Sequence, residues 1–142
     1  MRSAYMRVAI LPGHSLRCPE RQKTDRRGKI RAGLSLSMPA EAVVIFSTAG
    51  EGEAPSIAET LVKEHFASCV NITPVRSFYH WNGELCRDQE MLMMIKTTRE
   101  RSGATMARLR EIHSYELPEM LVLSVTGGYP PYLEWLSEEA RP

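Results

Sequence analysis

The spacing of apolar residues predicts alternating strands and helices from residue 42 onward. Residues 42–47 (AVVIFS) form a short, β-branched apolar run, which is typical of a strand buried on both faces. After a break rich in Gly and Glu, the apolar side chains of residues 57–66 follow helical spacing. Ser56 and Glu59 form an S-x-x-E capping box, which predicts that this helix starts near Ser56.

Residues 68–98 predict a long β-hairpin. Its two strands meet at Asn82-Gly83, a dipeptide that accepts the positive φ angles of a type I′ turn. At about 3.3 Å per residue, the segment from Ser68 to Trp81 would reach roughly 45 Å if it were regular. A compact domain of about 100 residues has a radius of gyration near 13 Å. We therefore expect the hairpin to extend beyond its own domain.

The two strands of the hairpin carry different patterns. In the first, the apolar face changes phase around Pro74, which predicts a bulge or a bend there. In the second, residues 91–95 (MLMMI) lack alternation, as expected for a central strand covered on both sides. Aromatic residues crowd the tip, and exposed apolar groups of this size favour a covering partner. The simplest partner is another copy of the chain, which would cover Phe78, Tyr79 and Trp81 at the tip. The predicted interface anchors are Tyr79, Trp81 and Trp135.

The rest of the chain predicts a helix, a strand and a helix. A second capping box at Thr97 opens a helix that should end near His113, before Pro118. Residues 120–125 (MLVLSV) predict the last core strand, and Pro130 suits the first turn of a C-terminal helix. The order is β-α-β-β-α-β followed by a helix. We predict an α+β fold of the ferredoxin-like type, an antiparallel sheet with two helices on one face, a long hairpin and an extra C-terminal helix.

Composition and charge limit the function classes. The chain has 142 residues and a net charge of +1, but residues 1–40 carry +7 and residues 41–142 carry −6. The acidic part is a poor match to nucleic acid, and no apolar run is long enough to span a bilayer. Three cysteines with no C-x-x-C pair fit a reducing compartment, so we predict a cytoplasmic protein.

We divide the chain into an extension, residues 1–37, and one domain, residues 38–142. The basic extension lacks periodicity and predicts either disorder or a start assigned too far upstream, with Met38 as the natural start. An Arg-rich, acid-poor segment also suits an organelle transit peptide, which stays an alternative.

Five motifs in register resemble the CutA proteins, the divalent-cation tolerance family. They are FASCVN (66–71), SFYHWNGEL (77–85), MMIKTT (93–98), HSYELPEMLVL (113–123) and YLEWL (132–136). The resemblance covers Ala42 to Glu138. It implies a ferredoxin-like subunit related in shape to the PII signalling proteins, packed sheet to sheet in a homotrimer through the hairpins and C-terminal segments. It also implies a role in divalent-metal tolerance, with copper or another divalent cation as ligand and none required for folding.

The family's copper ligands are one Cys at the end of the first strand and a His-His pair at the end of the second helix. The resemblance places them at Ser47, Ile112 and His113 of this chain. A hydroxyl is a poor exchange for a thiolate and isoleucine cannot ligate, so His113 is the one candidate metal ligand. As a structural residue, His113 would instead bond the last carbonyls of its helix.

A second candidate site is a polar cleft near the end of the hairpin strands. Lys96 ends an apolar strand, where its ammonium needs a carboxylate such as Glu119 or a substrate anion. With His113, Tyr115 and aromatics from an adjacent subunit, these residues would form a ligand-binding cleft; the aromatic candidates are Tyr79 and Trp81. The same aromatics also serve as interface anchors in the plainer interpretation.

No catalytic motif is present: the chain lacks a nucleophile elbow, a P-loop, HExxH and GxGxxG. We therefore predict a non-enzymatic homotrimer of the CutA type in divalent-metal homeostasis. The alternative is a PII-like signalling module that binds a small anionic ligand at subunit clefts. An RNA-binding module shares the element order, but the charge of −6 and the lack of an RNP-type strand oppose it.

Overall fold

The computed structural model describes residues 40–142. The predicted extension at residues 1–37 lies outside the described residues. The elements are β1 (Ala42–Ala49), α1 (Ala54–Lys63), β2 (Cys69–Trp81), β3 (Glu84–Thr98), α2 (Arg99–Ile112), β4 (Leu121–Ser124) and α3 (Pro130–Glu139). Their order confirms the predicted β-α-β-β-α-β pattern with a C-terminal helix.

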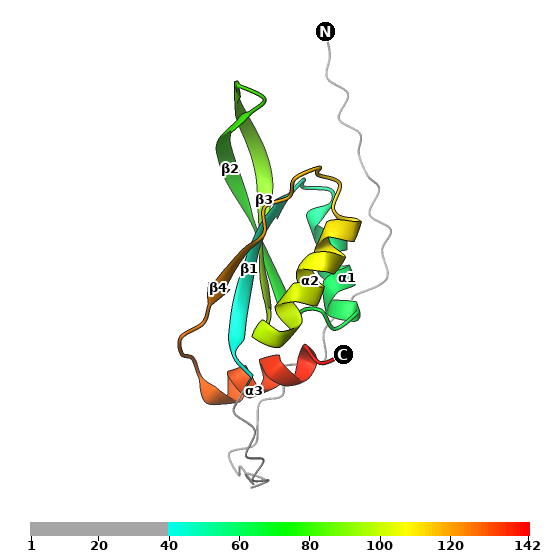
Figure 1. The fold of residues 1–142 in the computed structure, drawn as a ribbon, viewed down its shortest axis with the longest axis vertical. Coiled ribbons are helices and arrows are strands. Elements are labelled where there is room, and N and C mark those ends of the chain that lie inside the picture. The colour runs from blue at the N-terminus through cyan, green and yellow to red at the C-terminus, as the bar shows by residue number, and fades with distance from the viewer. Residues whose placement is uncertain (1–39) are drawn as a thin grey trace, which may run out of the picture. The chain divides into compact units, whose positions relative to one another are not determined.

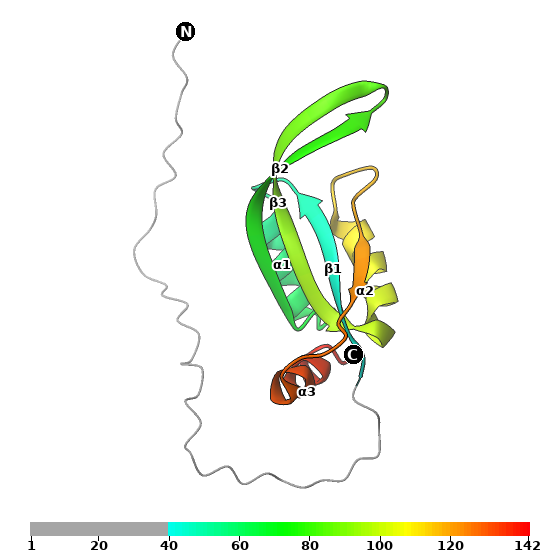
Figure 2. The ribbon, with the colours of Figure 1, turned by 90° about the vertical axis from the view of Figure 1, so that its left-hand side faces the viewer.

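The strands form one antiparallel sheet in the order β2-β3-β1-β4. Helices α1 and α2 lie on one side of the sheet, and α3 lies at the end opposite the hairpin tip (Figure 1). Turned by 90°, the sheet faces the viewer with α1 and α2 behind it (Figure 2). The helix-facing side holds the core, and the other side is left open.

The core follows from the two-residue period of the strands. Alternate residues of β1 and β3 point toward the helices and are fully buried, and Leu61 of α1 and Leu109 of α2 pack on them; the strand residues are Val43, Ile45, Met93 and Ile95. Two buried hydroxyls, on Thr97 and Thr105, both donate to the carbonyl of Phe66, at 2.9 and 2.8 Å. These bonds satisfy the backbone carbonyl of Phe66, just after the end of α1.

The hairpin extends past the sheet, as predicted. Pairing between β1 and β3 ends at Ala49↔Met91, whereas β2 and β3 continue for seven more pairs, from Val75↔Glu90 to Trp81↔Glu84. At about 3.3 Å per residue this part is roughly 23 Å long. We call residues 75–90 the arm; Figure 2 shows it bending away from the sheet.

The hairpin has the predicted turn. Of the bulge or bend predicted around Pro74, it has a bend and no bulge. Asn82 and Gly83 have φ angles of 50° and 82°, as a type I′ turn requires. The register from Cys69 to Trp81 is continuous, so the first strand contains no bulge. The bend instead occurs beyond the last pair with β1, where the sheet no longer constrains the twist of two strands.

Three predictions of local structure were wrong. Helix α1 begins at Ala54, with Glu53 as N-cap, because Pro55 fits the first helical turn; Ser56 lies inside the helix. The N-cap of α2 is Thr98, whose side chain accepts a bond from the Arg101 N–H at 3.2 Å, because Thr97 points into the core.

The third wrong prediction concerns burial. All four residues of β4 are exposed, although the sequence predicts a core strand. The strand lies at the sheet edge, so it gains cover from one neighbour only. In β3, likewise, Met93 and Ile95 are buried but Leu92 and Met94 are half-buried, because the single chain covers only one face of this central strand.

Candidate functional site

The loop between α2 and β4 is held against the end of β1 by His113. Its Nδ1 accepts a bond from the Tyr115 N–H at 3.1 Å, so Nε2 carries the proton and donates to the carbonyl of Thr48 at 2.8 Å. The next residue, Ser114, donates twice to the carboxylate of Glu53, from its N–H at 2.7 Å and its hydroxyl at 2.8 Å. The imidazole is only 5% exposed, so this anchor is structural.

The anchored loop places Tyr115 over the base of the arm. Its ring lies 4.8 Å from the imidazole of His113, and its hydroxyl donates to Oε1 of Glu90 at 2.8 Å. Burial, and then the hydrogen bond to Glu90, raise the pKa of Tyr115 to about 12. The phenol therefore stays protonated at neutral pH and can act only as a donor to Glu90.

These contacts border a solvent-open cavity of about 360 Å³, which we call the arm-base cavity. Its walls come from the end of β1, both strands of the arm and the anchored loop. Three carboxylates, two phenols, an indole, a hydroxyl and a leucine line it: Thr48, Tyr79, Trp81, Glu90, Tyr115, Glu116, Leu117 and Glu119. The lining contains no Lys, Arg or His, so the cavity is acidic.

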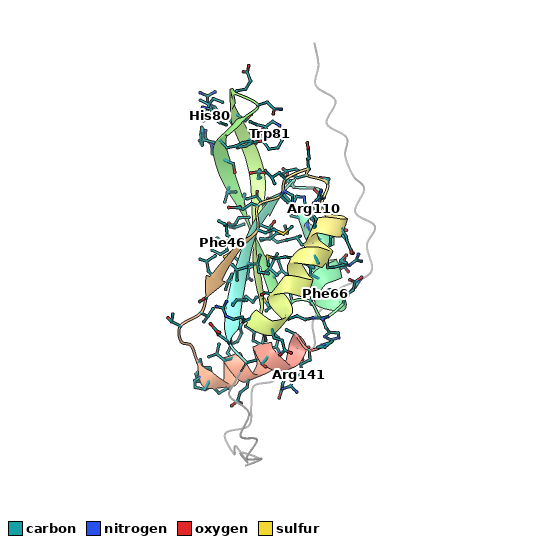
Figure 3. All side chains as sticks on the ribbon, viewed as in Figure 1. Phe46, Phe66, His80, Trp81, Arg110 and Arg141 are labelled. Carbon is teal, nitrogen blue, oxygen red and sulfur yellow. The ribbon has the colours of Figure 1, made fainter. Side chains whose placement is uncertain are left out.

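The aromatic wall belongs to one face of the arm. Tyr79 and Trp81 are two residues apart on β2 and thus share a face. The Tyr79 hydroxyl donates to Oδ2 of Asp88 at 2.5 Å, and this bond raises the pKa of Tyr79 to about 12. His80 lies on the other side of the arm from Trp81 (Figure 3). The arm therefore presents one aromatic and acidic face toward the cavity.

Comparison with known proteins identifies the family. The family model described as CutA1 divalent ion tolerance protein matches residues 42–139. This chain belongs to the CutA family. The divalent-cation tolerance protein CutA of Thermus thermophilus is 40% identical over 99 residues, which cover 69% of this chain and 96% of that protein. The CutA of Pectobacterium atrosepticum is 39% identical over 103 residues, 71% of this chain and 94% of that protein.

Solved CutA structures share the fold. The PII-like protein CutA of a Nostoc species aligns with a TM-score of 0.68 at 32% identity, over 70% of this chain and 97% of that one. CutA1 of Oryza sativa gives 0.71 at 33% identity, over 74% and 98%. The chain therefore has the PII-like, ferredoxin-like fold of the CutA proteins, as the motifs implied.

The structure brings together four of the six residues predicted for the ligand cleft. Tyr79, Trp81, Tyr115 and Glu119 all line the arm-base cavity. His113 lies behind it and supports Tyr115 rather than facing a ligand. Contrary to expectation, its imidazole bonds the β1 carbonyl of Thr48 instead of the last carbonyls of α2, because the loop folds back over β1.

Lys96 does not line the cavity, and the predicted ion pair between Lys96 and Glu119 does not form. Its Nζ donates to Oδ1 of Asn71 and lies 3.8 Å from Sγ of Cys69, both on β2, and Glu119 is not among its partners. Lys96 pairs with Cys69 near one end of β2, whereas Glu90 pairs with Val75 at the start of the arm. The cross-strand neighbours on the same face therefore solvate the ammonium.

Sequence reasoning missed Glu90, the most buried residue of the cavity. Its side chain is 7% exposed, although it stands between the polar residue Gln89 and the apolar run 91–95. The sequence did contain a signal for it: Glu90 lies two positions before Leu92, so it shares a face with apolar residues on a central strand, where a carboxylate is unusual. Thr48, Glu116 and Leu117 were missed as well, since only the folded loop brings them to the arm.

The positions of the family's copper ligands do not fit copper in this chain. Oγ of Ser47 is fully buried and has no hydrogen-bond partner, Ile112 has no donor atom, and both nitrogens of His113 are engaged. Copper prefers thiolate, thioether or imidazole ligands, and this set offers no free one. Among residues 40–142, no group of three or more His, Cys, Asp or Glu side chains is placed to hold a metal ion.

Proposed function

We propose that this CutA protein is a non-enzymatic divalent-cation tolerance protein that works as a homotrimer. One observation carries the proposal: the sheet face away from α1 and α2 is apolar and uncovered. We call it the open face; its apolar residues, by strand register, are Val44, Phe46, Leu92, Met94, Leu121 and Leu123. Phe46 lies on this side of the sheet in Figure 3. Contiguous apolar surface of this kind is typical of an interface.

The arm supports the same proposal. Phe78 is 58% exposed at its tip, and Tyr79, Trp81 and Leu85 are exposed as well. An isolated two-stranded hairpin is marginally stable in water at best. Copies of the chain that pack their open faces together would also cover the arms. The curated relatives are named for divalent-cation tolerance, which supplies the biological role in the proposal.

Sedimentation of matched variants tests the trimer. Leu123→Asp places a charge on the open face and should dissociate the trimer, because an unpaired carboxylate would be buried between subunits. Val62→Asp is the control, since Val62 is similarly exposed, 39% against 42%, but belongs to α1 on the other side of the sheet. A monomer in dilute wild-type solution, or a trimeric Leu123→Asp variant, would refute the proposal.

The role in metal tolerance does not require copper at the three family positions. We expect calorimetry with Cu²⁺ and Cu⁺ to give the same weak binding for the wild type and for His113→Ala. Restoring the family donors in the double variant Ser47→Cys, Ile112→His should strengthen copper binding, because it adds a thiolate and an imidazole. Submicromolar copper binding by the wild type that His113→Ala abolishes would contradict this reasoning.

The acidic lining of the arm-base cavity does not favour the alternative of an anionic ligand, and Lys96 is too far along the sheet to offset it. None of the described helices is long and apolar enough to cross a membrane. We propose a cytoplasmic location from the cysteine usage, although relatives include a protein named chloroplastic; fractionation of the full chain tests it.

A further inference from the structure

The turn of the arm places an asparagine followed by a glycine at the far end of the hairpin. Asn82 and Gly83 follow the last cross-strand pair of the arm, and every residue from 78 to 85 is exposed. His80 and Trp81 mark this tip in Figure 3. Because the turn joins the two strands, it belongs to neither face of the arm, and cover on the open face alone does not enclose it.

The backbone nitrogen of Gly83 is available as a nucleophile. The hydrogen bond that closes a two-residue turn joins the residues on either side of it, here Trp81 and Glu84, so the turn does not use the N–H of Gly83. A Cβ added at Gly83 would meet nothing within 4 Å, so no neighbouring residue crowds this part of the turn. Attack of the Gly83 nitrogen on Cγ of Asn82 would close a succinimide ring.

The tip can reach the geometry that this attack needs. Pairing with β1 ends at Met91, so the seven pairs of the arm form a two-stranded ribbon, which is marginally stable by itself. Asn82 has a φ of 50°, a left-handed conformation that is unfavourable for an L residue. Opening the tip relaxes Asn82 and lets the Gly83 nitrogen approach Cγ. At loop tips and fraying ends, the free energy of such opening is close to zero.

The second asparagine of the chain lacks these features. Asn71 lies within β2, where it pairs with Met94 of the central strand β3, and its Oδ1 accepts a bond from Nζ of Lys96. Ile72 follows it, and a β-branched side chain crowds the backbone nitrogen that would have to attack. Asn71 is therefore an internal control in the same molecule.

We propose that Asn82 is a site of spontaneous deamidation, a covalent modification in which water is the one co-reactant. The Gly83 nitrogen bonds to Cγ of Asn82 and the Cγ–Nδ2 bond breaks, so that ammonia leaves with the proton of the Gly83 nitrogen. Water then opens the succinimide: its hydroxyl adds to one of the two carbonyls, and its proton returns to the nitrogen. One opening gives aspartate at position 82, and the other gives isoaspartate, whose backbone runs through the side chain.

The two products differ in their effect on the arm. Aspartate adds one negative charge to the tip and keeps the turn, because Asp-Gly also accepts the type I′ conformation. Isoaspartate adds a backbone atom between the strands. Since the length of the turn fixes the register of a hairpin, the pair Trp81↔Glu84 is lost. Isoaspartate therefore loosens the tip, whereas aspartate changes its charge alone.

Mass spectrometry of the aged full chain tests the proposal. After incubation in mildly alkaline buffer, the peptide with Asn82 should gain the mass of an amide-to-acid exchange, and electron-transfer fragmentation should reveal isoaspartate in it. The peptide with Asn71 should stay unchanged. Because the tip opens at little cost, the rate should lie within about tenfold of that in a synthetic peptide of residues 77–87. A slower rate at Asn82, or equal rates at the two asparagines, would overturn the proposal.

Two variants identify the reacting groups. Gly83→Ala crowds the attacking nitrogen and should slow the reaction by about tenfold or more. Asn82→Gln lengthens the side chain, so that attack would need a larger ring, and should leave position 82 unmodified. If one variant loses the arm, the other still gives the measurement. An unchanged rate in Gly83→Ala, or equal modification of Asn82→Gln, would rule out attack by the Gly83 nitrogen.

Hydrogen exchange separates the effects of charge and register. Asn82→Asp supplies the charge without the extra backbone atom, so its tip amides should exchange as in the fresh wild type. The isoaspartate product should exchange faster at Trp81 and Glu84. Equal exchange in the two samples would show that the arm accommodates the extra atom, and the predicted loosening would be wrong.

Discussion

The hydroxyl of Ser47 offers a sharp test of the packing. It is fully buried on the helix-facing side of β1, and its Oγ is the one buried side-chain polar atom of residues 40–142 without a hydrogen-bond partner. A buried hydroxyl left unpaired costs roughly 1–3 kcal/mol of folding free energy. We therefore expect Ser47→Ala to stabilise the protein rather than weaken it.

The expected magnitude is the balance of two terms. Removing the oxygen relieves the unpaired group, and the void it leaves is smaller than a methyl group, which costs under about 1 kcal/mol. The net gain should be about 1–2 kcal/mol. For a domain of about 100 residues, this corresponds to a rise in Tm of at least about 4 °C.

A second buried hydroxyl in the same core serves as control. Thr105 is also fully buried, but its single hydroxyl proton is shared between the carbonyls of Phe66, at 2.8 Å from Oγ1, and Arg101, at 3.0 Å. Thr105→Val keeps the shape and removes both bonds, so it should destabilise by about 1 kcal/mol. The two changes delete the same chemical group and should move stability in opposite directions.

Urea unfolding at one fixed protein concentration measures both variants, because association would make the midpoints depend on concentration. The reasoning fails if Ser47→Ala lowers the free energy of unfolding, or if it changes by no more than the fitting error while Thr105→Val behaves as expected. Either result would mean that the Ser47 hydroxyl has a partner in solution.

Three further predictions follow from the fold. Truncating the core residue Leu109, which is fully buried, to Ala should cost about 2–5 kcal/mol in urea unfolding, and a loss below about 1 kcal/mol would show a loosely packed core. Trp81→Ala should weaken the trimer, and unchanged sedimentation at low micromolar concentration would contradict its role as an anchor. Tyr115 has its pKa raised from 10.0 to about 12, so the fold favours its neutral form; its contribution to stability is complete below pH 10 and is lost as the pH rises toward 12. Tyr115→Phe should flatten the fall of the urea midpoint between pH 10 and 12, whereas the exposed Tyr129→Phe should leave it unchanged.

The order of elements and the turn of the hairpin could be predicted from the amino-acid sequence. Both depend on residues a few positions apart: the period of apolar side chains separates strand from helix, and Asn82-Gly83 accepts the positive φ of the tight turn. Pro130 marks the start of α3 for the same local reason. The arm was predictable too, because strand length sets its reach.

Local patterns misjudged the helix starts where tertiary contacts competed with them. By sequence Thr97 is the predicted cap, because Glu100 completes a capping box with it, but the register of β3 points Thr97 into the core, where it bonds Phe66. Ala54 is buried, so packing extends α1 beyond its capping box, and Pro55 in the first turn permits this.

The candidate site could not be predicted from the sequence, because the fold assembles it from distant segments. Thr48, Glu90 and Tyr115 meet because His113 anchors the loop to β1, and no spacing rule connects residues so far apart in the chain. The fold also separated Lys96 from Glu119, since Lys96 bonds Asn71 and Cys69 on the neighbouring strand rather than the opposite charge that the sequence suggests. The sign of the cavity's charge is thus a property of the assembled surface, because it depends on which side chains the fold brings together and which it keeps apart.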